Sequence, residues 1–353
     1  METALYCPDC GFYEKEKDNV GRRGDFFTSV SVGNLFGELL AFQFTEWLET
    51  KDGTPDAQFG TRNPEFRIVE AGAHDGQLAA DILSWLRARR ERTFGRLEYC
   101  IVEPSARRRE WQRKKLKDFE KTVKWVSEMA ALKRDLQSSN TIIFSNELLD
   151  AMPVRRFGWD AAARKWFEWG VGFEGGKFVW ARLENSGFQV PNSGLEAVLP
   201  DGYVIETSPA AEAWWREAAE TLAQGKLLAI DYGFTADEEF SPSRLNGTLR
   251  AYHRHRLAED VLANPGEQDL TAHVNFSAIQ KIGEAVGLRT ETFSAQSQFL
   301  SRIVEKIFQQ PPSFGEWAPK QTRQFQTLTH PEHLGRAFRL LVQSRGMRQE
   351  ASS

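Results

Sequence analysis

The feature that most constrains the fold of this chain is an apolar segment that runs into a glycine-containing turn at residues 68–76, IVEAGAHDG. The pattern predicts a buried strand that delivers Glu70, followed by a tight turn that contains Gly72 and Gly76. Glycine has no Cβ, so it lets the backbone approach a ligand closely. Glu103, at the end of the next predicted strand, can accept hydrogen bonds from two ribose hydroxyls. Together these features predict a nucleoside-containing cofactor on an α/β sheet.

Predicted strands and helices alternate along most of the chain. Such alternation is typical of a doubly wound, mostly parallel sheet with helices on both faces. Right-handed crossovers then bring the loops after the strands to one edge, where ligands of open α/β sheets bind. The predicted strands are 66–71, 97–103, 122–126, 140–145, 226–231 and 288–293, and the predicted helices are 34–50, 76–90, about 105–120, 209–224 and 276–286.

Two regions interrupt this alternation. Residues 154–205 carry short segments rich in Trp and Phe between glycine-containing turns, which predict an inserted β-hairpin region. Residues 234–275 are punctuated by Gly and Pro and predict a long loop. We therefore predict an N-terminal loop and helix segment at 1–60 and a domain at 61–353 that contains both the insert and the long loop.

Composition narrows the classes of partner. The chain has 353 residues, and its net charge of −4 gives no general attraction to nucleic acid or to acidic membranes. No apolar run reaches the roughly 18 residues of a membrane span. The first six residues resemble neither a signal peptide nor a transit peptide. We therefore expect a cytoplasmic protein with no nucleic-acid or membrane partner, and we expect the basic helix at about 105–120 to place its charges in water.

The cysteines predict neither a disulfide framework nor a metal site. There are three of them, and an odd, low count is unusual for a disulfide-stabilised protein. Cys7 and Cys10 have the spacing of half a zinc site, but no second pair completes it. Cys100 lies in the middle of a predicted strand and is expected to be a small core residue.

A second polar group follows the predicted strand at 140–145. Asn146, Glu147 and Asp150 come directly after this strand, so they are expected at the ligand edge of the sheet. They could bind a cation or position an amine for attack on an electrophile. Alternatively, Asn146 caps a following helix and the two acids lie in its first turn. The two interpretations are compatible, and the sequence leaves both open.

Other motifs carry weaker signals. The turn at 72–76 lacks the third glycine of the dinucleotide fingerprint, and the chain has no P-loop, so a nucleoside without phosphates is the better candidate ligand. Asp25 and Thr28 precede the predicted helix at 34–50, and one of them is expected to act as its cap. Asp231 ends another predicted strand on the same edge, where a role at the substrate is plausible.

Taken together and in this order, the motifs resemble those of the MidA-like class I methyltransferases, from about residue 4 to past residue 290. This family includes a mitochondrial arginine methyltransferase that acts in complex I assembly. The segments that carry the resemblance are 4–8 (ALYCP), 11–13 (GFY), 24–29 (GDFFTS), 35–39 (LFGEL), 70–76 (EAGAHDG), 146–153 (NELLDAMP), 230–233 (IDYG), 247–252 (GTLRAY), 265–266 (PG) and 269–274 (DLTAHV).

The resemblance implies S-adenosyl-L-methionine as the cofactor and a Rossmann-like, seven-stranded sheet whose last strand is antiparallel. It implies that Asn146, Glu147 and Asp150 are catalytic and face the methyl acceptor, which would be an arginine nitrogen of a protein substrate. Paired carboxylates can hold a guanidinium bidentately and orient one nitrogen toward the methyl carbon. The cofactor-binding residues that the resemblance implies are Glu70, Gly72, Ala73, Asp75, Gly76, Glu103, Asp25 and Thr28.

The chain departs from the family pattern at two positions. His74 replaces the middle glycine of the family's Glu-Leu-Gly-Pro-Gly-x-Gly turn, and Asn275 stands where the family has aspartate. Two other functions therefore stay open: a non-catalytic assembly or interaction protein that retains the fold, and a methyltransferase for a small molecule. The sequence makes no prediction of oligomeric state.

Overall fold

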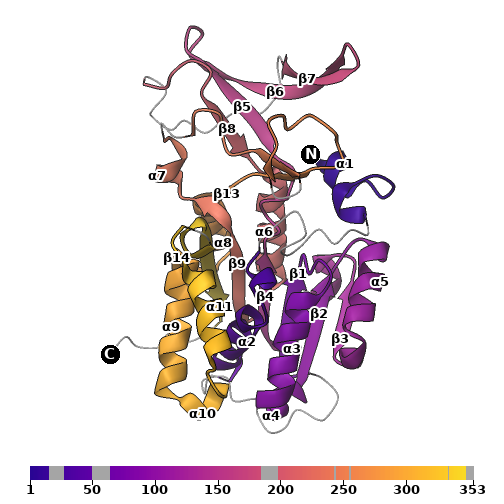
Figure 1. Cartoon of the computed structure of the whole chain (residues 1–353), viewed down its shortest axis with the longest axis vertical. Helices are drawn as coiled ribbons and strands as arrows, with labels where there is room; N and C mark the ends of the chain where they lie inside the picture. Colours follow the sequence, from indigo (N-terminus) through magenta and orange to yellow (C-terminus); the bar gives the residue numbers. More distant parts are fainter. Residues whose placement is uncertain are drawn as a thin grey trace.

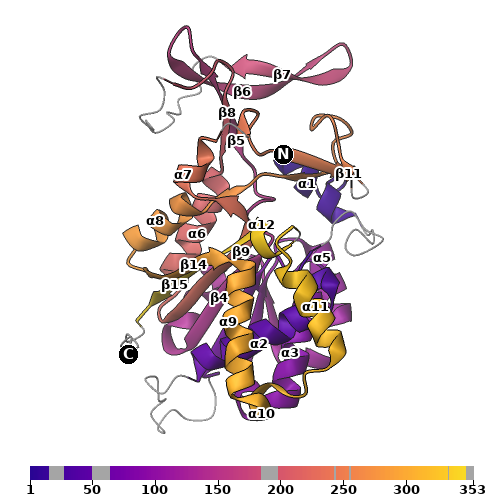
Figure 2. The same cartoon turned by 60° about the vertical axis from the view of Figure 1, so that its left-hand side comes forward.

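The structure, a computed structural model, describes residues 1–15, 28–49, 64–183, 198–241, 244–253, 256–332 and 334–346. Its largest sheet is mixed and has the strand order β3-β2-β1-β4-β9-β15-β14 (Figures 1 and 2). The strands are β1 (Phe66–Ala71), β2 (Leu97–Val102), β3 (Val123–Val126), β4 (Asn140–Asn146), β9 (Gly225–Phe234), β14 (Arg289–Ala295) and β15 (Phe338–Arg345).

The directions of these strands confirm the predicted doubly wound sheet. β1 runs parallel to β2 and to β4, and β4 runs parallel to β9. β15, the last strand in the sequence, lies between β9 and β14 and is antiparallel to both. A short strand, β13 (Val274–Asn275), adds a parallel pair at the end of β9.

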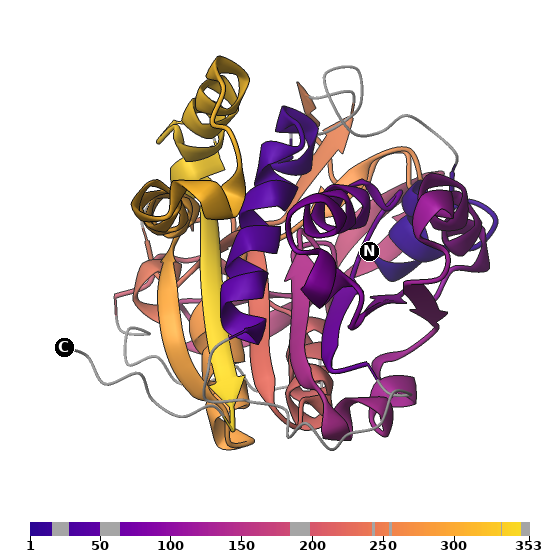
Figure 3. The ribbon, with the colours of Figure 1, turned by 90° about the horizontal axis from the view of Figure 1, so that it is seen from below.

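Helices cover both faces of the main sheet (Figures 2 and 3). Successive residues of β4 point to opposite faces, so Ile142 and Phe144 join one core and Ile143 joins the other. Burial on both faces explains the apolar stretches within the parallel strands. One face carries α2 (Leu35–Leu48), α3 (Gln77–Arg89), α5 (Ala106–Lys115) and α9 (Gln296–Gln309), and the other carries α6 (Pro209–Thr221) and α8 (Phe276–Ala285).

α2 packs between α3 and α9, so this helix belongs to the core of the main sheet.

Shorter helices complete the described chain. The remaining helices are α1 (Glu2–Tyr6), α4 (Glu91–Phe94), α7 (Ala236–Glu239), α10 (Pro311–Phe314), α11 (Pro319–Thr329) and α12 (Leu334–Ala337), with 3-10 turns η1 (Phe12–Glu14), η2 (Val30–Val32), η4 (Lys117–Phe119), η5 (Met129–Leu132) and η6 (Asp135–Ser138).

The predicted β-rich insert is present as an antiparallel sheet with the order β7-β6-β5-β8. It stands beyond the end of the main sheet, and the β6–β7 hairpin projects away from the body of the protein (Figure 1). Residues 184–197, within the predicted insert, lie outside the described residues. The strands are β5 (Arg155–Asp160), β6 (Lys165–Glu174), β7 (Lys177–Leu183) and β8 (Val204–Thr207).

The prediction of a long loop at 234–275 is wrong. This region contains α7 and a second small antiparallel sheet with the order β11-β10-β12, formed by β10 (Arg250–His253), β11 (Arg256–Leu257) and β12 (Asp269–Thr271). Strands of two to four residues are too short to show an alternating pattern. The sheet is stabilised instead by distant contacts, since Ala251 and Leu270 pack against Leu5 and Phe12.

No helix in these described ranges combines the length and the apolar character that are needed to cross a membrane.

Candidate functional site

The predicted glycine turn lies where the loops after β1 and β4 meet. Gly72 (φ 78°) and Gly76 (φ 87°) both adopt the left-handed conformation, which suits glycine because it has no Cβ. A Cβ on Gly72 would lie 3.0 Å from Cδ1 of Leu148, and one on Gly76 would lie 3.3 Å from Cδ1 of Leu116. The turn therefore leaves little room for a side chain at either position.

His74 occupies the position at which the resemblance implies a glycine, and it does so in a left-handed conformation (φ 48°). Its carbonyl oxygen accepts a hydrogen bond of 3.0 Å from Nε2 of Gln112. The turn thus keeps the backbone conformation that glycine favours, with a histidine in place of it.

The left-handed conformation of His74 is strained for a residue with a side chain, which leads to a first prediction. We expect His74→Gly to raise the free energy of unfolding by up to about 1 kcal/mol, because glycine relieves a left-handed residue at some cost in unfolded-state entropy. Urea denaturation measures the change. Arg164→Gly is a matched control, because Arg164 has φ 50° in the turn between β5 and β6. A loss of stability in the His74 variant would contradict the assignment of strain.

Glu103 follows β2 directly and is almost completely buried, with 1% of its surface exposed. One carboxylate oxygen accepts the Ser105 backbone N–H at 2.9 Å and lies 3.0 Å from a guanidinium nitrogen of Arg108. The other accepts Nε2 of Gln112 at 3.1 Å. Burial raises the pKa of Glu103, and the Arg108 charge opposes this shift.

Gln112 is a positioning residue that the sequence did not reveal. Its side chain is fully buried, and its amide nitrogen bonds both the His74 carbonyl and the Glu103 carboxylate. Its amide oxygen accepts the indole N–H of Trp125 at 3.0 Å. The glycine turn and the acid after β2 are therefore held by one side chain from α5. A glutamine in a basic, strongly polar helix carries no local signal of this role.

The expectation that α5 places its charges in water needs correction for Arg108. Its side chain is largely buried and forms ion pairs with Glu103 and Glu14. Glu14 also accepts a hydrogen bond of 2.7 Å from the Ser105 hydroxyl. An internal acid needs a charged partner, and Arg108 supplies it. These contacts place the N-terminal segment beside Glu103.

Two further acids belong to the glycine turn: Glu70 lies in β1 just before the turn, and Asp75 lies within it. Glu70 is buried at the end of β1, where its carboxylate accepts the Tyr99 hydroxyl at 2.7 Å. Burial raises the pKa of Glu70 to about 7. Asp75 is partly exposed, accepts the Gln77 backbone N–H at 2.9 Å and lies 3.3 Å from Nζ of Lys115. Ala73, between them in the turn, is buried.

The segment after β4 is not a helix, so the interpretation of Asn146 as a helix cap is wrong. Leu148 to Asp150 form an irregular turn, whose backbone N–H groups point at one buried carboxylate, that of Asp231. Its Oδ2 atom accepts from the N–H groups of Leu148 (3.2 Å), Leu149 (2.9 Å) and Asp150 (3.4 Å). Asp231 lies in β9, so an acid distant in sequence takes the place of a helix cap.

Glu147 adopts a left-handed conformation (φ 53°), which is uncommon for a residue with a side chain. Its carboxylate accepts Nδ2 of Asn146 at 3.0 Å and the backbone N–H of Ser29. The Oδ1 atom of Asn146 is buried and has no hydrogen-bond partner in the described part of the chain. A donor from a water or a ligand can bond such an acceptor.

Asp150 and Asp231 form a buried pair of carboxyl groups beside Glu147. Burial and the charges of Asp231 and Asp269 raise the pKa of Asp150 well above its usual range. Burial also raises the pKa of Asp231 to about 7 and, together with the Asp150 charge, that of Glu147 to about 8. No Lys or Arg of the described ranges forms an ion pair with Glu147, Asp150 or Asp231.

The N-terminal segment packs against this acidic group. The Tyr13 hydroxyl donates a hydrogen bond of 2.6 Å to Asp269, which is buried in β12. The Tyr6 hydroxyl donates a bond of 2.9 Å to the carbonyl oxygen of Ala151. Residues far apart in the sequence therefore enclose the acids, which no local pattern could predict.

Thr28 does not cap α2 as the sequence predicts, because α2 begins after Asn34 and the chain between them forms η2. Its Oγ1 accepts the Ser31 backbone N–H at 3.1 Å at the start of η2. Asp25 lies outside the described residues.

The cysteines are free thiols. Cys10 Sγ lies 3.0 Å from Cys7 Sγ near the surface, and Cys100 is buried in β2. Among the residues that the structure describes, no group of three or more His, Cys, Asp or Glu side chains is arranged to hold a metal ion.

A family model described as "Putative S-adenosyl-L-methionine-dependent methyltransferase" matches residues 39–294. This range includes the glycine turn and the acids Glu70, Glu103, Glu147, Asp150 and Asp231. The chain belongs to this methyltransferase family. Its cofactor is S-adenosyl-L-methionine.

A solved relative supports the same assignment for this methyltransferase. A Burkholderia thailandensis protein described as a "likely methyl transferase", bound to S-adenosyl-homocysteine, is 32% identical and has a TM-score of 0.77. The match covers 99% of this chain and 87% of the solved chain. The agreement over nearly the whole length shows that the two proteins share their overall fold.

The curated relatives of this methyltransferase are more distant in sequence. The mitochondrial protein arginine methyltransferase NDUFAF7 homolog of Drosophila melanogaster is 26% identical over 98% of this chain and 80% of its own length. NDUFAF7 of Mus musculus is 27% identical over 80% of this chain and 65% of its own length. The chain therefore spans about two thirds of the mouse relative.

Proposed function

We propose that this methyltransferase transfers the methyl group of S-adenosyl-L-methionine to an arginine side-chain nitrogen of a protein substrate. The observation that carries the proposal is a group of acids, the buried Asp150 and Asp231 with the half-buried Glu147, which has no ion-pair partner in the described chain. Uncompensated buried carboxyls favour a cationic ligand. The names of the NDUFAF7 relatives support arginine as the source of that cation.

For the cofactor we propose the residues that the resemblance implies. The turn at Gly72, which a Cβ would fill, fits close approach of the methionine part, and the buried Glu103 carboxylate fits ribose hydroxyls. Glu70, Ala73, Asp75 and Gly76 would complete this side. We also propose that residues 1–60, with Asp25 and Thr28, close the cofactor site, because Glu14 already contacts Ser105 and Arg108 beside Glu103.

For the acceptor we propose Asn146, Glu147 and Asp150. When bound, the cofactor supplies an electrophilic methyl group on a sulfonium. Glu147 and Asp150 would hold the guanidinium from two sides and orient one nitrogen, and the unsatisfied Oδ1 of Asn146 would accept an N–H. A carboxylate of this group would take up the proton that the nitrogen loses on methylation.

The raised pKa of Glu147 predicts a pH dependence that can be measured without a substrate. A carboxyl whose pKa is higher in the folded state than in the unfolded state makes the fold less stable as pH rises. The expected window extends from the ordinary pKa of 4.5 to about 8. We therefore expect the melting temperature of the wild type to fall relative to that of Glu147→Gln between pH 5 and pH 8.5.

Thermal melts at four pH values in this range test that expectation. Glu120→Gln is the control, because Glu120 is exposed after α5, and its melting curve should follow that of the wild type. Parallel profiles of the wild type and the Glu147 variant would mean that this carboxyl ionises normally.

The test of the function itself is methyl transfer to arginine-containing peptides. We expect labelled S-adenosyl-L-methionine to modify a random peptide library that contains arginine, and not the same library with lysine in its place. Glu147→Gln and Asp150→Asn should lower transfer by 100-fold or more, on the order of 3 kcal/mol of transition-state energy, while Glu120→Gln should not.

Two other results would point elsewhere. Cofactor binding without transfer to any peptide or metabolite would favour a non-catalytic assembly protein. Transfer to a protein-free metabolite extract alone would favour a small-molecule acceptor.

A cytoplasmic location stays a prediction.

A further inference from the structure

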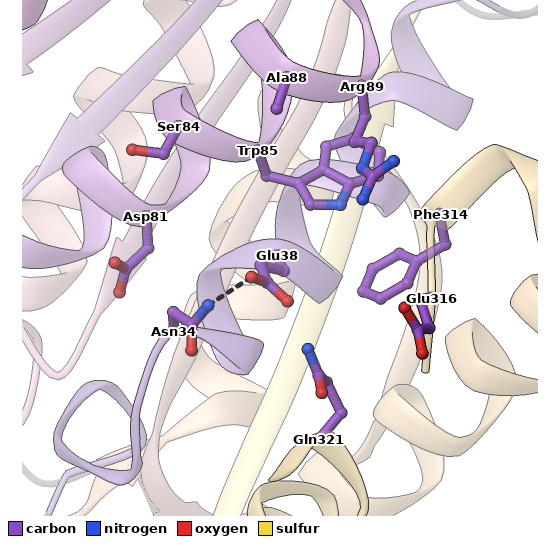
Figure 4. A pocket seen from close by; sticks show the side chains of 10 residues that line it. All are labelled: Asn34, Glu38, Asp81, Ser84, Trp85, Ala88, Arg89, Phe314, Glu316 and Gln321. Atoms are coloured by element: carbon purple, nitrogen blue, oxygen red, sulfur yellow. Dashed lines mark hydrogen bonds between the residues drawn. The ribbon is translucent and has the colours of Figure 1, made fainter. Parts of the chain in front are cut away.

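A cavity of about 380 Å³ lies on the outer side of α2 and α3, next to the segment that joins α10 to α11 (Figure 4). It is separate from the glycine turn, since its wall follows α3 from Asp81 to Arg89, well after the start of that helix. Trp85 and Phe314 form an aromatic side of the cavity, with their ring centroids 5.7 Å apart.

Two buried polar atoms at this cavity have no partner in the described part of the chain. The first is the indole Nε1 of Trp85, a residue that is only 6% exposed. The second is the amide Oε1 of Gln321. Figure 4 shows the indole nitrogen turned toward the space between Glu38, Phe314 and Gln321. A buried donor and a buried acceptor left open at one cavity fit a ligand that offers both kinds of group.

The charged groups at the cavity are also of both signs. Glu38 and Asp81 each have one oxygen engaged, by Asn34 and by Gln77 respectively. The charges here are those of Glu38, Asp81 and Glu316 on the acidic side and of Arg89 and Lys320 on the basic side, with Lys320 bonded to Asn34.

The Arg89 guanidinium lies against the backbone of Gly315. Within the ranges that the structure covers, it forms no ion pair and donates no hydrogen bond. A guanidinium placed at the rim of a cavity without a partner can bind a carboxylate in a bidentate manner. Glu38, which lines the same cavity from α2, can bind an ammonium group.

We propose that this cavity binds a small zwitterion of the amino-acid class. The ammonium group bonds Glu38 and the Gln321 carbonyl oxygen, the carboxylate bonds Arg89 and the Trp85 N–H, and an apolar side chain packs on Trp85 and Phe314. The site goes beyond the proposed methyl transfer and does not depend on the identity of the methyl acceptor.

Calorimetric titration of the full chain with L-phenylalanine and L-leucine tests the proposal. The controls are phenethylamine, which lacks the carboxylate, and 3-phenylpropionate, which lacks the ammonium; both should bind at least about tenfold more weakly. Trp85→Phe keeps an aromatic ring and removes the N–H, and it should weaken binding of the amino acid by about tenfold or more.

Trp317→Phe is the matched control variant, because the Trp317 N–H is already bonded to Thr322 and the residue does not line the cavity. It should bind like the wild type. Thermal melts without ligand show whether each variant is folded, and Glu38→Gln provides a second variant if Trp85→Phe does not fold.

Three results would overturn the proposal. One is the absence of binding at millimolar amino acid to protein that binds S-adenosyl-homocysteine. Another is equal binding by Trp85→Phe, or by Glu38→Gln if it is used. The third is loss of binding at saturating S-adenosyl-homocysteine, which would place the amino acid in the methionine part of the cofactor site. Failure here leaves the methyl-transfer assay unchanged, so the two proposals fail separately.

Discussion

Gly72→Val is expected to abolish binding of S-adenosyl-homocysteine. The residue has φ 78°, and a Cβ there would meet the Leu148 side chain at 3.0 Å, so a branched side chain has to displace the loop after β4 or enter the space of the turn. A β-branched residue also disfavours the left-handed conformation. Calorimetric titration of the wild type and the variant measures the loss, which we expect to exceed 100-fold, or about 3 kcal/mol.

Gly202→Val separates the effect of the backbone from the effect of the site. Gly202 has nearly the same conformation (φ 76°) and lies in the loop before β8, where a Cβ would have no other atom within 4 Å. It should lose stability to a similar backbone strain and bind S-adenosyl-homocysteine normally. If Gly72→Val is folded and binds like the wild type, the cofactor does not use this turn.

Asp231→Ala is expected to lower the free energy of unfolding by on the order of 3 kcal/mol, because it leaves several buried N–H groups without an acceptor. The carboxylate of Asp231 accepts the backbone N–H groups of Leu148, Leu149 and Tyr232 at 2.9–3.2 Å. The turn that carries Glu147 should lose its shape, so methyl transfer should fall together with stability. Urea denaturation at pH 8 measures the first effect.

Asp160→Ala is the control for this substitution. Asp160 also accepts a backbone N–H, from Ala163 at 2.8 Å, but it lies near the surface at the end of β5. Water can replace such an acceptor, so the loss should stay below about 1 kcal/mol. Equal losses for the two variants would show that Asp231 does not organise the turn after β4.

The main sheet could be predicted because its signals are local. The strands β1, β2 and β4 are buried on both faces, so each one contains an apolar stretch and is followed by a polar turn. The antiparallel direction of the last strand, by contrast, came only as an implication of the family resemblance, and neither the strand at β15 nor its place between β9 and β14 was predicted.

The small sheet at 250–271 and helix α1 could not be predicted for a related reason. Their stability comes from contacts between segments more than 200 residues apart, such as those of Leu5 with Ala251. Short elements with distant partners have little intrinsic preference of their own.

For the site, the sequence by itself determined which residue types end the strands: Glu70, Glu103, Asn146 and Asp231, together with the glycines between them. Strand ends in a parallel sheet converge on one edge, so their meeting could be anticipated.

Only the tertiary structure decided what these groups do to one another. It placed Asp231 under the turn after β4, Gln112 between the glycine turn and Glu103, and Tyr13 against Asp269. Burial then raised the pKa of Glu147 to about 8. Burial, distances and hydrogen-bond directions depend on residues far apart in the sequence. The residues that end a strand, by contrast, follow that strand directly in the sequence.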